Sequence, residues 1–290
     1  MKIVFFGTPD YVMPILTSLH KKFVTGPGKS PIIAVVTQPP RPVGRKQIPA
    51  YSPVDKWAHA RKIPIYYSAN DLIDNPTEAV LGILASYGEI IKEDVIDLFP
   101  QGILVIHPSL LPKYRGASPV PEAIKNGDET TGVTIFKMDK KMDHGPIISQ
   151  FKEEILPGDT GETLRARLFE KSAGVLTELI GPYIQSKIKP KIQDESLATY
   201  TKIITKEDGF IDLNKKSTDE ADRFIRAMQP WPCAWTRIRV SEENKRLKIL
   251  KAHLEENKLI LDEVQLEGKL PTTWKQFKEG YKDATFETGR

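Results

Sequence analysis

Short apolar runs alternate with helical patterns through roughly the first 180 residues, and this alternation constrains the fold more than any other feature of the sequence. The apolar runs lie at Ile3–Phe6, Ile32–Thr37, Leu81–Ala85 and Ile103–Ile106. Such runs are typical of the central strands of a parallel sheet, which helices cover on both faces. We therefore predict an α/β fold with a Rossmann-like, doubly wound and mostly parallel sheet.

The connection after the first predicted strand contains Gly7, Thr8 and Pro9. We predict that Thr8 caps the first helix and that Pro9 takes its first helical position. The G-x-G-x-x-G pattern of dinucleotide-binding loops does not occur at this point, so the connection gives no support for a dinucleotide site.

The alternation stops after residue 186, and the chain becomes polar. We predict a first domain over 1–186, a linker over 187–205 and a second domain over 206–290. The second domain contains strand-like segments at Ala234–Val240, Leu247–His253 and Lys258–Gln265, with a turn at Glu256-Asn257. We predict that it forms a small, OB-like β-barrel with Trp231 and Trp235 in its core.

The composition restricts the environment of the chain. A single cysteine, Cys233, excludes an internal disulfide framework and indicates a reducing compartment. No apolar run reaches the length of a membrane span, and the short apolar start lacks the cleavage site of a signal peptide. We expect a cytoplasmic monomer that binds no membrane. The five histidines lack paired ligand spacing, so no metal site is predicted, and the net charge of +4 permits an RNA partner without requiring one.

Two residues stand where an acyl-transfer site would need them. His107 directly follows the run Ile103–Ile106, and ligands bind beyond the carboxyl ends of parallel strands. Asp143 lies in a loop after the next strand, and a carboxylate beside His107 would stabilise the charged imidazolium. That arrangement can stabilise an oxyanion and move a proton. The residues alone leave an alternative, a structural histidine and ordinary turn-forming aspartates at 139 and 143.

Six segments of the chain resemble a known family in order and spacing. They are Phe6–Asp10 (FGTPD), Thr37–Arg45 (TQPPRPVGR), Ala85–Gly88 (ASYG), His107–Gly116 (HPSLLPKYRG), Met138–Gly145 (MDKKMDHG) and Ile225–Pro232 (IRAMQPWP). The chain resembles the folate-dependent formyltransferases, and within them the methionyl-tRNA formyltransferases. The SLLP and D-x-G segments are common to folate formyltransferases, whereas the TQPPRPVGR loop and the PWP segment indicate the tRNA-directed branch.

The resemblance implies transfer of a formyl group from 10-formyltetrahydrofolate to the α-amine of methionine on initiator tRNA. It implies that His107 stabilises the tetrahedral oxyanion, while Asp143 holds His107 charged and helps to move the amine proton. It also implies a folate site that is formed by two loops and closed by His144, the residue after Asp143. The implied folate-binding residues are Ser86, Tyr87, Gly88, Ile90, Ser109, Leu110, Leu111, Pro112 and His144.

A basic loop matches the implied acceptor. Arg41, Arg45 and Lys46 lie in a stretch whose prolines keep the chain extended. The resemblance implies that this loop enters the acceptor end of the tRNA, where cations would contact phosphates and base edges. The alternative interpretation is a solvated loop with incidental charge.

One position departs from the family pattern. The family places an asparagine two residues before the catalytic histidine, whereas this chain has Val105 there. The asparagine amide would donate a hydrogen bond to the formyl oxygen, and valine has no donor. Because removal of one oxyanion donor typically lowers a rate about 10²–10³-fold, we predict an intact fold with impaired formyl transfer.

The second domain also departs from the family, which usually carries further strands where this chain has the tight turn at Glu256-Asn257. We therefore predict an abbreviated barrel. Two other hypotheses stay open. One is a formyltransferase that acts on an amino-sugar nucleotide, and the other is a catalytically inactive homologue that binds folate or RNA.

Overall fold

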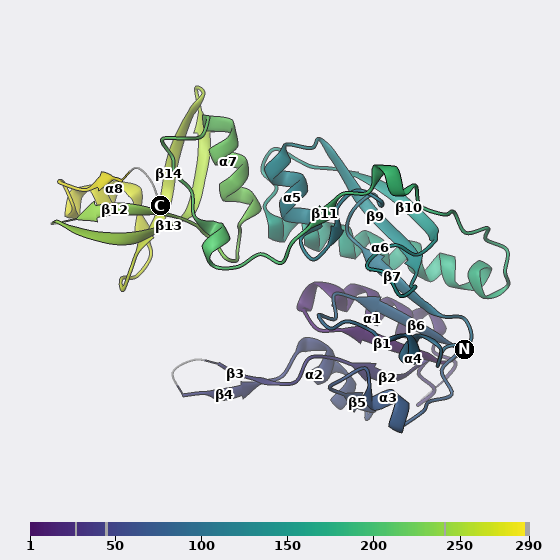
Figure 1. Ribbon diagram of the computed structural model, residues 1–290. Helices are drawn as coiled ribbons and strands as arrows, with labels where there is room; N and C mark the ends of the chain where they lie inside the picture. Colours follow the sequence, from purple (N-terminus) through teal and green to yellow (C-terminus); the bar gives the residue numbers. More distant parts are fainter. Residues whose placement is uncertain (27, 44–45, 241, 288–290) are drawn as a thin grey trace. The chain divides into compact units, whose positions relative to one another are not determined.

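The structure is a computed structural model that describes residues 1–26, 28–43, 46–240 and 242–287 (Figure 1). Its contacts divide the chain into two compact units. The first unit comprises residues 1–115, 132–153 and 165–200, and the second comprises 116–131, 154–164 and 201–290. The predicted division into a first domain over 1–186, a linker over 187–205 and a second domain over 206–290 stays a prediction.

A seven-stranded sheet forms the centre of the first unit, in the order β10-β9-β7-β6-β1-β2-β5. Strands β7, β6, β1, β2 and β5 are parallel, and β9 runs antiparallel to β7, so the predicted mostly parallel sheet is confirmed. The strands are β1 (Ile3–Gly7), β2 (Ile32–Val36), β5 (Ile65–Tyr66), β6 (Leu81–Ala85), β7 (Ile103–His107), β9 (Thr130–Lys137) and β10 (Ile147–Glu154).

Helices cover both faces of this sheet, as its apolar strands require. On one face Val4 and Phe6 of β1 pack in the same buried cluster as Val95 and Phe99 of the α4 region. Residues Ile3 and Phe5 point to the opposite face because side chains alternate along a strand. The helices are η1 (Asp10–Val12), α1 (Met13–Phe23), α2 (Pro53–His59), α3 (Asp71–Asp74), α4 (Glu93–Ile96), α6 (Gly161–Ile184) and η2 (Glu195–Leu197).

The start of the first helix differs from the prediction. The α-helix begins at Met13 after a 3-10 turn, and its N-cap is Val12 rather than Thr8. The hydroxyl of Thr8 instead donates to the carbonyl of Tyr87 at 3.1 Å and accepts from the Gln38 amide at 3.2 Å. The prediction was wrong because these long-range partners, which no local pattern reveals, take the hydroxyl that a cap would need.

The second unit is built on an antiparallel sheet in the order β15-β14-β13-β12-β16. Helix α7 packs against this sheet, and a capping box of Ser217 and Glu220 fixes its start. The elements are α5 (Pro119–Asn126), η3 (Glu207–Gly209), α7 (Thr218–Ala227), β12 (Ala234–Val240), β13 (Glu243–Glu255), β14 (Lys258–Leu266), β15 (Thr272–Thr273), α8 (Trp274–Gly280) and β16 (Thr285–Phe286). The short strands β8 (Arg115–Gly116) and β11 (Tyr200–Thr201) lie where the units adjoin in sequence.

Two sequence predictions about this second unit have different outcomes. The turn between β13 and β14 lies at Glu256-Asn257, as predicted, and both residues have the positive φ that a two-residue hairpin turn requires. Trp235 is buried as predicted, but Trp231 is 55% exposed and the prediction of a core position was wrong. Trp231 lies in a turn between two prolines, where no strand alternation directs its side chain inward.

In the part of the chain that the structure describes, no helix combines the length and the apolar character that crossing a bilayer requires.

Candidate active site

Strand β7 presents Val105 and His107 on the same face of the sheet, because the two residues are two positions apart. Both are buried, with 4% and 5% of their surfaces exposed. Val105 packs against Leu111 and Phe136 in a small apolar cluster. The side chain that stands at the asparagine position is therefore well packed, and it brings no hydrogen-bond donor to this face.

Both ring nitrogens of His107 face oxygen acceptors. Its Nε2 lies 2.9 Å from the carbonyl oxygen of Tyr114, and since a carbonyl only accepts, Nε2 carries a hydrogen. Its Nδ1 lies 3.6 Å from Oδ2 of Asp143, slightly beyond a direct hydrogen bond. The structure thus brings together the two predicted catalytic side chains, and a doubly protonated ring could donate toward both neighbours.

Asp143 reaches His107 by a route that the strand order does not suggest. Because β9 is antiparallel to β7, the loop after β9 begins beside the start of β7, where the Met138 amide donates to the Ile103 carbonyl at 2.8 Å. The loop must fold back across the sheet face to place Asp143 beside His107. Asp143 has a φ of 48°, a left-handed conformation that aspartate tolerates better than most residues.

Gly145 allows this loop to close, because its backbone lies directly against that of Lys137. A Cβ atom on residue 145 would overlap the Lys137 carbonyl oxygen and also approach the Phe136 ring at 3.2 Å. The Lys137 amide in turn donates to the Pro146 carbonyl at 3.0 Å. The glycine of the D-x-G segment is therefore required by close backbone packing.

We expect Gly145→Ala to destabilise the protein by about 1–3 kcal/mol, because a backbone carbonyl cannot move away as a side chain can. The measurement is urea unfolding. The matched control is Gly174→Ala in the interior of α6, where nothing lies within 4 Å of the new methyl group and about 0.5–1 kcal/mol of stabilisation is expected. Equal stability of the Gly145→Ala variant and the parent would contradict this account of the loop.

The turn after His107 is held by internal hydrogen bonds. The hydroxyl of Ser109 is fully buried and donates to the Lys113 carbonyl at 2.6 Å. The Leu111 amide donates to the hydroxyl of Thr134 at 3.0 Å, and Leu111 is 3% exposed. Among the four residues predicted to bind folate here, Leu110 and Pro112 are the more accessible, since both are half-buried.

In the loop after β6, too, some of the predicted folate-binding residues are buried and others are exposed. Tyr87 is 1% exposed, and burial together with a hydrogen bond to Glu89 raises the pKa of its phenol well above the usual range. Ser86 and Gly88 have positive φ values of 48° and 93°, which turn the chain sharply at the carboxyl end of β6. Ile90 is 84% exposed, an unusual state for an apolar side chain, so it is available to a ligand.

A second feature of the first unit is an open cleft of about 420 Å³ beside a two-stranded ribbon. Strands β3 (Arg41–Val43) and β4 (Ile48–Ala50) form the ribbon, which projects from the sheet (Figure 1). The cleft is lined by Thr8, Pro9, Gln38, Pro39, Arg41, Val43, Ala50, Tyr51, Ser52, Pro53, Ser86 and Tyr87. Of the three predicted RNA-binding residues, Arg41 and Lys46 are exposed, and Arg45 lies outside the described residues.

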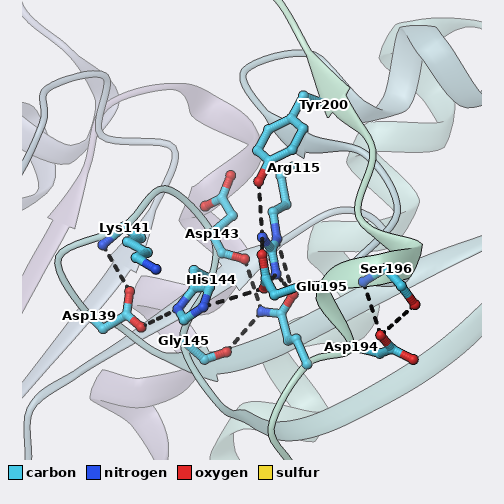
Figure 2. Close-up of polar contacts among 11 residues, drawn as sticks. Arg115, Asp139, Lys141, Asp143, His144, Gly145, Asp194, Glu195, Ser196 and Tyr200 are labelled. Atoms are coloured by element: carbon cyan, nitrogen blue, oxygen red, sulfur yellow. Dashed lines mark hydrogen bonds and ion pairs between the residues drawn. The ribbon is translucent and has the colours of Figure 1, made fainter.

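His144 belongs to a polar network that the sequence did not reveal. Its Nδ1 lies 2.6 Å from Asp139, and its Nε2 lies 3.3 Å from Glu195. Figure 2 shows the side chains of Asp143 and His144 pointing away from each other, with His144 directed toward Asp139 and Glu195. Arg115 belongs to the segment His107–Gly116 that resembles the family, but no role was predicted for it. Glu195 lies in the segment predicted to be a linker. Only the position of Arg115 in the motif could have signalled this network.

The chain is similar to known proteins over most of its length. A family model described as "Formyl transferase" matches residues 1–180, and one described as "Formyl transferase, C-terminal domain" matches residues 203–260. A methionyl-tRNA formyltransferase of Roseiflexus sp. (strain RS-1) is 39% identical over 81% of this chain and 73% of that protein. One from Protochlamydia amoebophila is 34% identical over 97% of this chain and 95% of that protein.

The fold is also found in solved structures. An N-formyltransferase from Helicobacter canadensis, solved in complex with folinic acid and dTDP-3-aminofucose, superposes with a TM-score of 0.67 at 21% identity. The superposition covers 88% of this chain and 88% of that one. At this identity the likeness establishes the architecture of the chain alone.

Proposed function

The chain belongs to the formyl transferase family, and from this premise we propose that it transfers a formyl group from 10-formyltetrahydrofolate to the methionine amine of initiator methionyl-tRNA. The observation that carries the proposal is the pairing of His107 and Asp143 on the face of β7. The names of the sequence relatives support the tRNA-linked acceptor. The proposal includes the cytoplasm as the place of action and a single chain as the active species.

The proposed chemistry is direct acyl transfer. The methionine amine attacks the formyl carbon, and the carbonyl oxygen becomes an oxyanion in the tetrahedral intermediate. The Nδ1–H of His107, which at 3.6 Å makes no direct hydrogen bond to Asp143, donates to that oxyanion while the Tyr114 carbonyl fixes the ring through Nε2. Asp143 stabilises the imidazolium and accepts the proton that the amine loses. The intermediate then collapses as the C–N10 bond breaks and N10 of tetrahydrofolate takes up a proton.

Val105 weakens this machinery in the proposal. It occupies the strand position from which an asparagine amide would donate a second hydrogen bond to the oxyanion, and its side chain is packed against apolar neighbours. One missing donor corresponds to a transfer rate lower by about 10²–10³-fold. We therefore propose an impaired formyltransferase whose fold and binding sites are retained.

The proposed folate site lies between the loops that follow β6 and β7. Exposed Ile90 and half-buried Leu110 and Pro112 supply accessible apolar surface. We propose that Ser86, Tyr87 and Gly88 of the loop after β6 complete this site together with Ser109, Leu111 and His144. No metal takes part in the proposed reaction.

The proposed tRNA contact is the basic ribbon of β3 and β4. We expect Arg41→Ala and Lys46→Ala each to weaken binding of charged initiator tRNA. Because each substitution removes one proposed phosphate contact, the plot of log K against log salt should become less steep by about 1. Binding is measured by filter retention between low and moderate salt. The matched control is Lys29→Ala, an exposed lysine of the same unit outside the ribbon. An unchanged salt slope for both ribbon variants would show that the ribbon does not contact the tRNA.

One assay separates the proposed acceptor from the other two hypotheses. The protein is incubated with 10-formyltetrahydrofolate and, in parallel, with charged initiator tRNA and with an amino-sugar nucleotide. We expect slow formylation of the charged initiator tRNA and no formylation of the amino-sugar nucleotide. Formylation of the sugar alone would replace the proposed acceptor, and folate binding by calorimetry without any product would indicate a binding protein.

A further inference from the structure

The side-chain amide of Gln193 joins the Asp143 loop to the rest of the first unit. Its Nε2 donates to the carbonyl of Asp143 at 2.9 Å and to that of Gly145 at 2.8 Å. Gln193 is 6% exposed and lies in the segment predicted to be a linker. That segment is itself anchored, since Lys191 and Ile147 exchange backbone hydrogen bonds of 2.7 and 2.8 Å. One buried amide therefore holds the loop backbone on both sides of His144.

Arg115 sets the orientation of this amide. Its Nε and Nη2 donate to Oε1 of Gln193 at 3.2 and 2.8 Å, and Arg115 is 1% exposed. A guanidinium carries donors only, so the amide oxygen must face Arg115 and the NH₂ group must face the two loop carbonyls. The reversed amide would place donors against donors and oxygen against oxygens.

Arg115 is in turn held as a cation. Glu195 accepts hydrogen bonds from its Nη2 at 2.6 Å and its Nη1 at 3.1 Å, and the Tyr200 hydroxyl lies 3.1 Å from Nη1 (Figure 2). The hydrogen bond with Glu195 raises the pKa of Arg115, and that with Arg115 lowers the pKa of Glu195. A buried guanidinium needs such partners, because an unpaired buried charge is strongly destabilising.

The same arginine lies next in sequence to the residue that holds the other catalytic candidate. Arg115 directly follows Tyr114, whose carbonyl accepts from Nε2 of His107. The Gln193 amide thus holds two carbonyls of the loop that carries Asp143, and Arg115 adjoins the residue whose carbonyl holds His107.

We propose that Gln193 is a positioning residue for formyl transfer, which sets the carboxylate of Asp143 relative to His107, and that Arg115 orients Gln193 for this task. The inference rests on the proposed function. The side chain of Gln193 contacts the loop backbone and Arg115, so in this proposal it acts through the backbone of the Asp143 loop. A misplacement of about 1 Å in such a site can lower a rate about 10²-fold.

The test is Gln193→Glu in the Val105→Asn background, where transfer is expected to be fastest. A glutamate keeps the size of the side chain and its contact with Arg115, but it has no N–H for the loop carbonyls. We expect kcat to fall about 10–100-fold, with the KM for the folate donor changed less than about threefold. The matched control is Asp194→Asn, an exposed neighbour that contacts Ser196 and should leave kcat unchanged.

A merely structural role for Gln193 gives a different result. It would lower the midpoint of thermal unfolding while kcat per folded molecule stayed at the parent value, and that outcome would overturn the proposal. A change in KM alone, with kcat retained, would overturn it as well.

A spectroscopic readout tests Gln193 without turnover. The ring-nitrogen resonances of His107, assigned with a His107→Gln variant, are compared among variants of the otherwise unchanged chain. We expect Gln193→Glu to shift them in the same direction as Asp143→Asn, and Asp194→Asn to leave them in place. If the Val105→Asn background transfers formyl to no acceptor, the proposed function fails, and these resonances still decide on Gln193. Unchanged resonances in Gln193→Glu would refute the positioning role.

Discussion

Val105→Asn should raise the rate of formyl transfer about 10²–10³-fold, the amount that one oxyanion donor typically contributes. Residue 105 lies on the same face of β7 as His107, so an amide there would approach the oxyanion from beside the imidazole. The gain should appear in kcat, because the donor acts on charge that develops only in the transition state. The measurement is steady-state formylation of charged initiator tRNA with both substrates varied.

This gain should come at a cost in stability. Val105 is 4% exposed and packs against Leu111 and Phe136, so an amide without a bound formyl group would be poorly satisfied. We expect the free energy of unfolding to fall by about 1–3 kcal/mol. Val105→Leu is the matched control, since leucine resembles asparagine in shape and has no donor. Equal rates for the parent, Val105→Asn and Val105→Leu would show that this chain needs no donor at residue 105.

His107→Ala should lower kcat about 10²–10⁴-fold in the Val105→Asn background, the usual contribution of a positioned acid–base group. The ring is held by Tyr114 on one side and faces Asp143 on the other, so no described neighbour is placed to substitute for it. Binding of a folate analogue, measured by calorimetry, should change only a few-fold, because the proposed folate contacts come from other residues.

The control for this loss is His253→Ala. His253 also pairs with an aspartate, at 2.9 Å from Asp262, but it lies on the surface of the second unit. Its removal should leave kcat unchanged. If both His107→Ala and His253→Ala retained the kcat of the Val105→Asn background, the assignment of His107 as a catalytic group would be wrong.

The sequence predicted most of the fold because the relevant signals are local. Runs such as Ile103–Ile106 are apolar on both faces, which is typical of a covered parallel strand. The turn at Glu256-Asn257 was predictable for the same reason, since two residues suffice to define it. Thr8 and Trp231 were predicted wrongly because distant hydrogen-bond partners and a proline-bounded turn determine their positions, and a local window contains neither.

In the candidate site, too, the local features were predictable from the sequence and the long-range contacts were not. The sequence by itself determined that His107 ends a buried strand and that a valine occupies the position two residues before it. Only the tertiary structure decided that the Asp143 loop, which leaves an antiparallel strand at the far end of β7, folds back to His107. It also decided that Gln193 and Arg115 hold that loop. A side chain 50 residues away along the chain leaves no periodic trace in sequence, because folding alone brings the two segments into hydrogen-bonding distance.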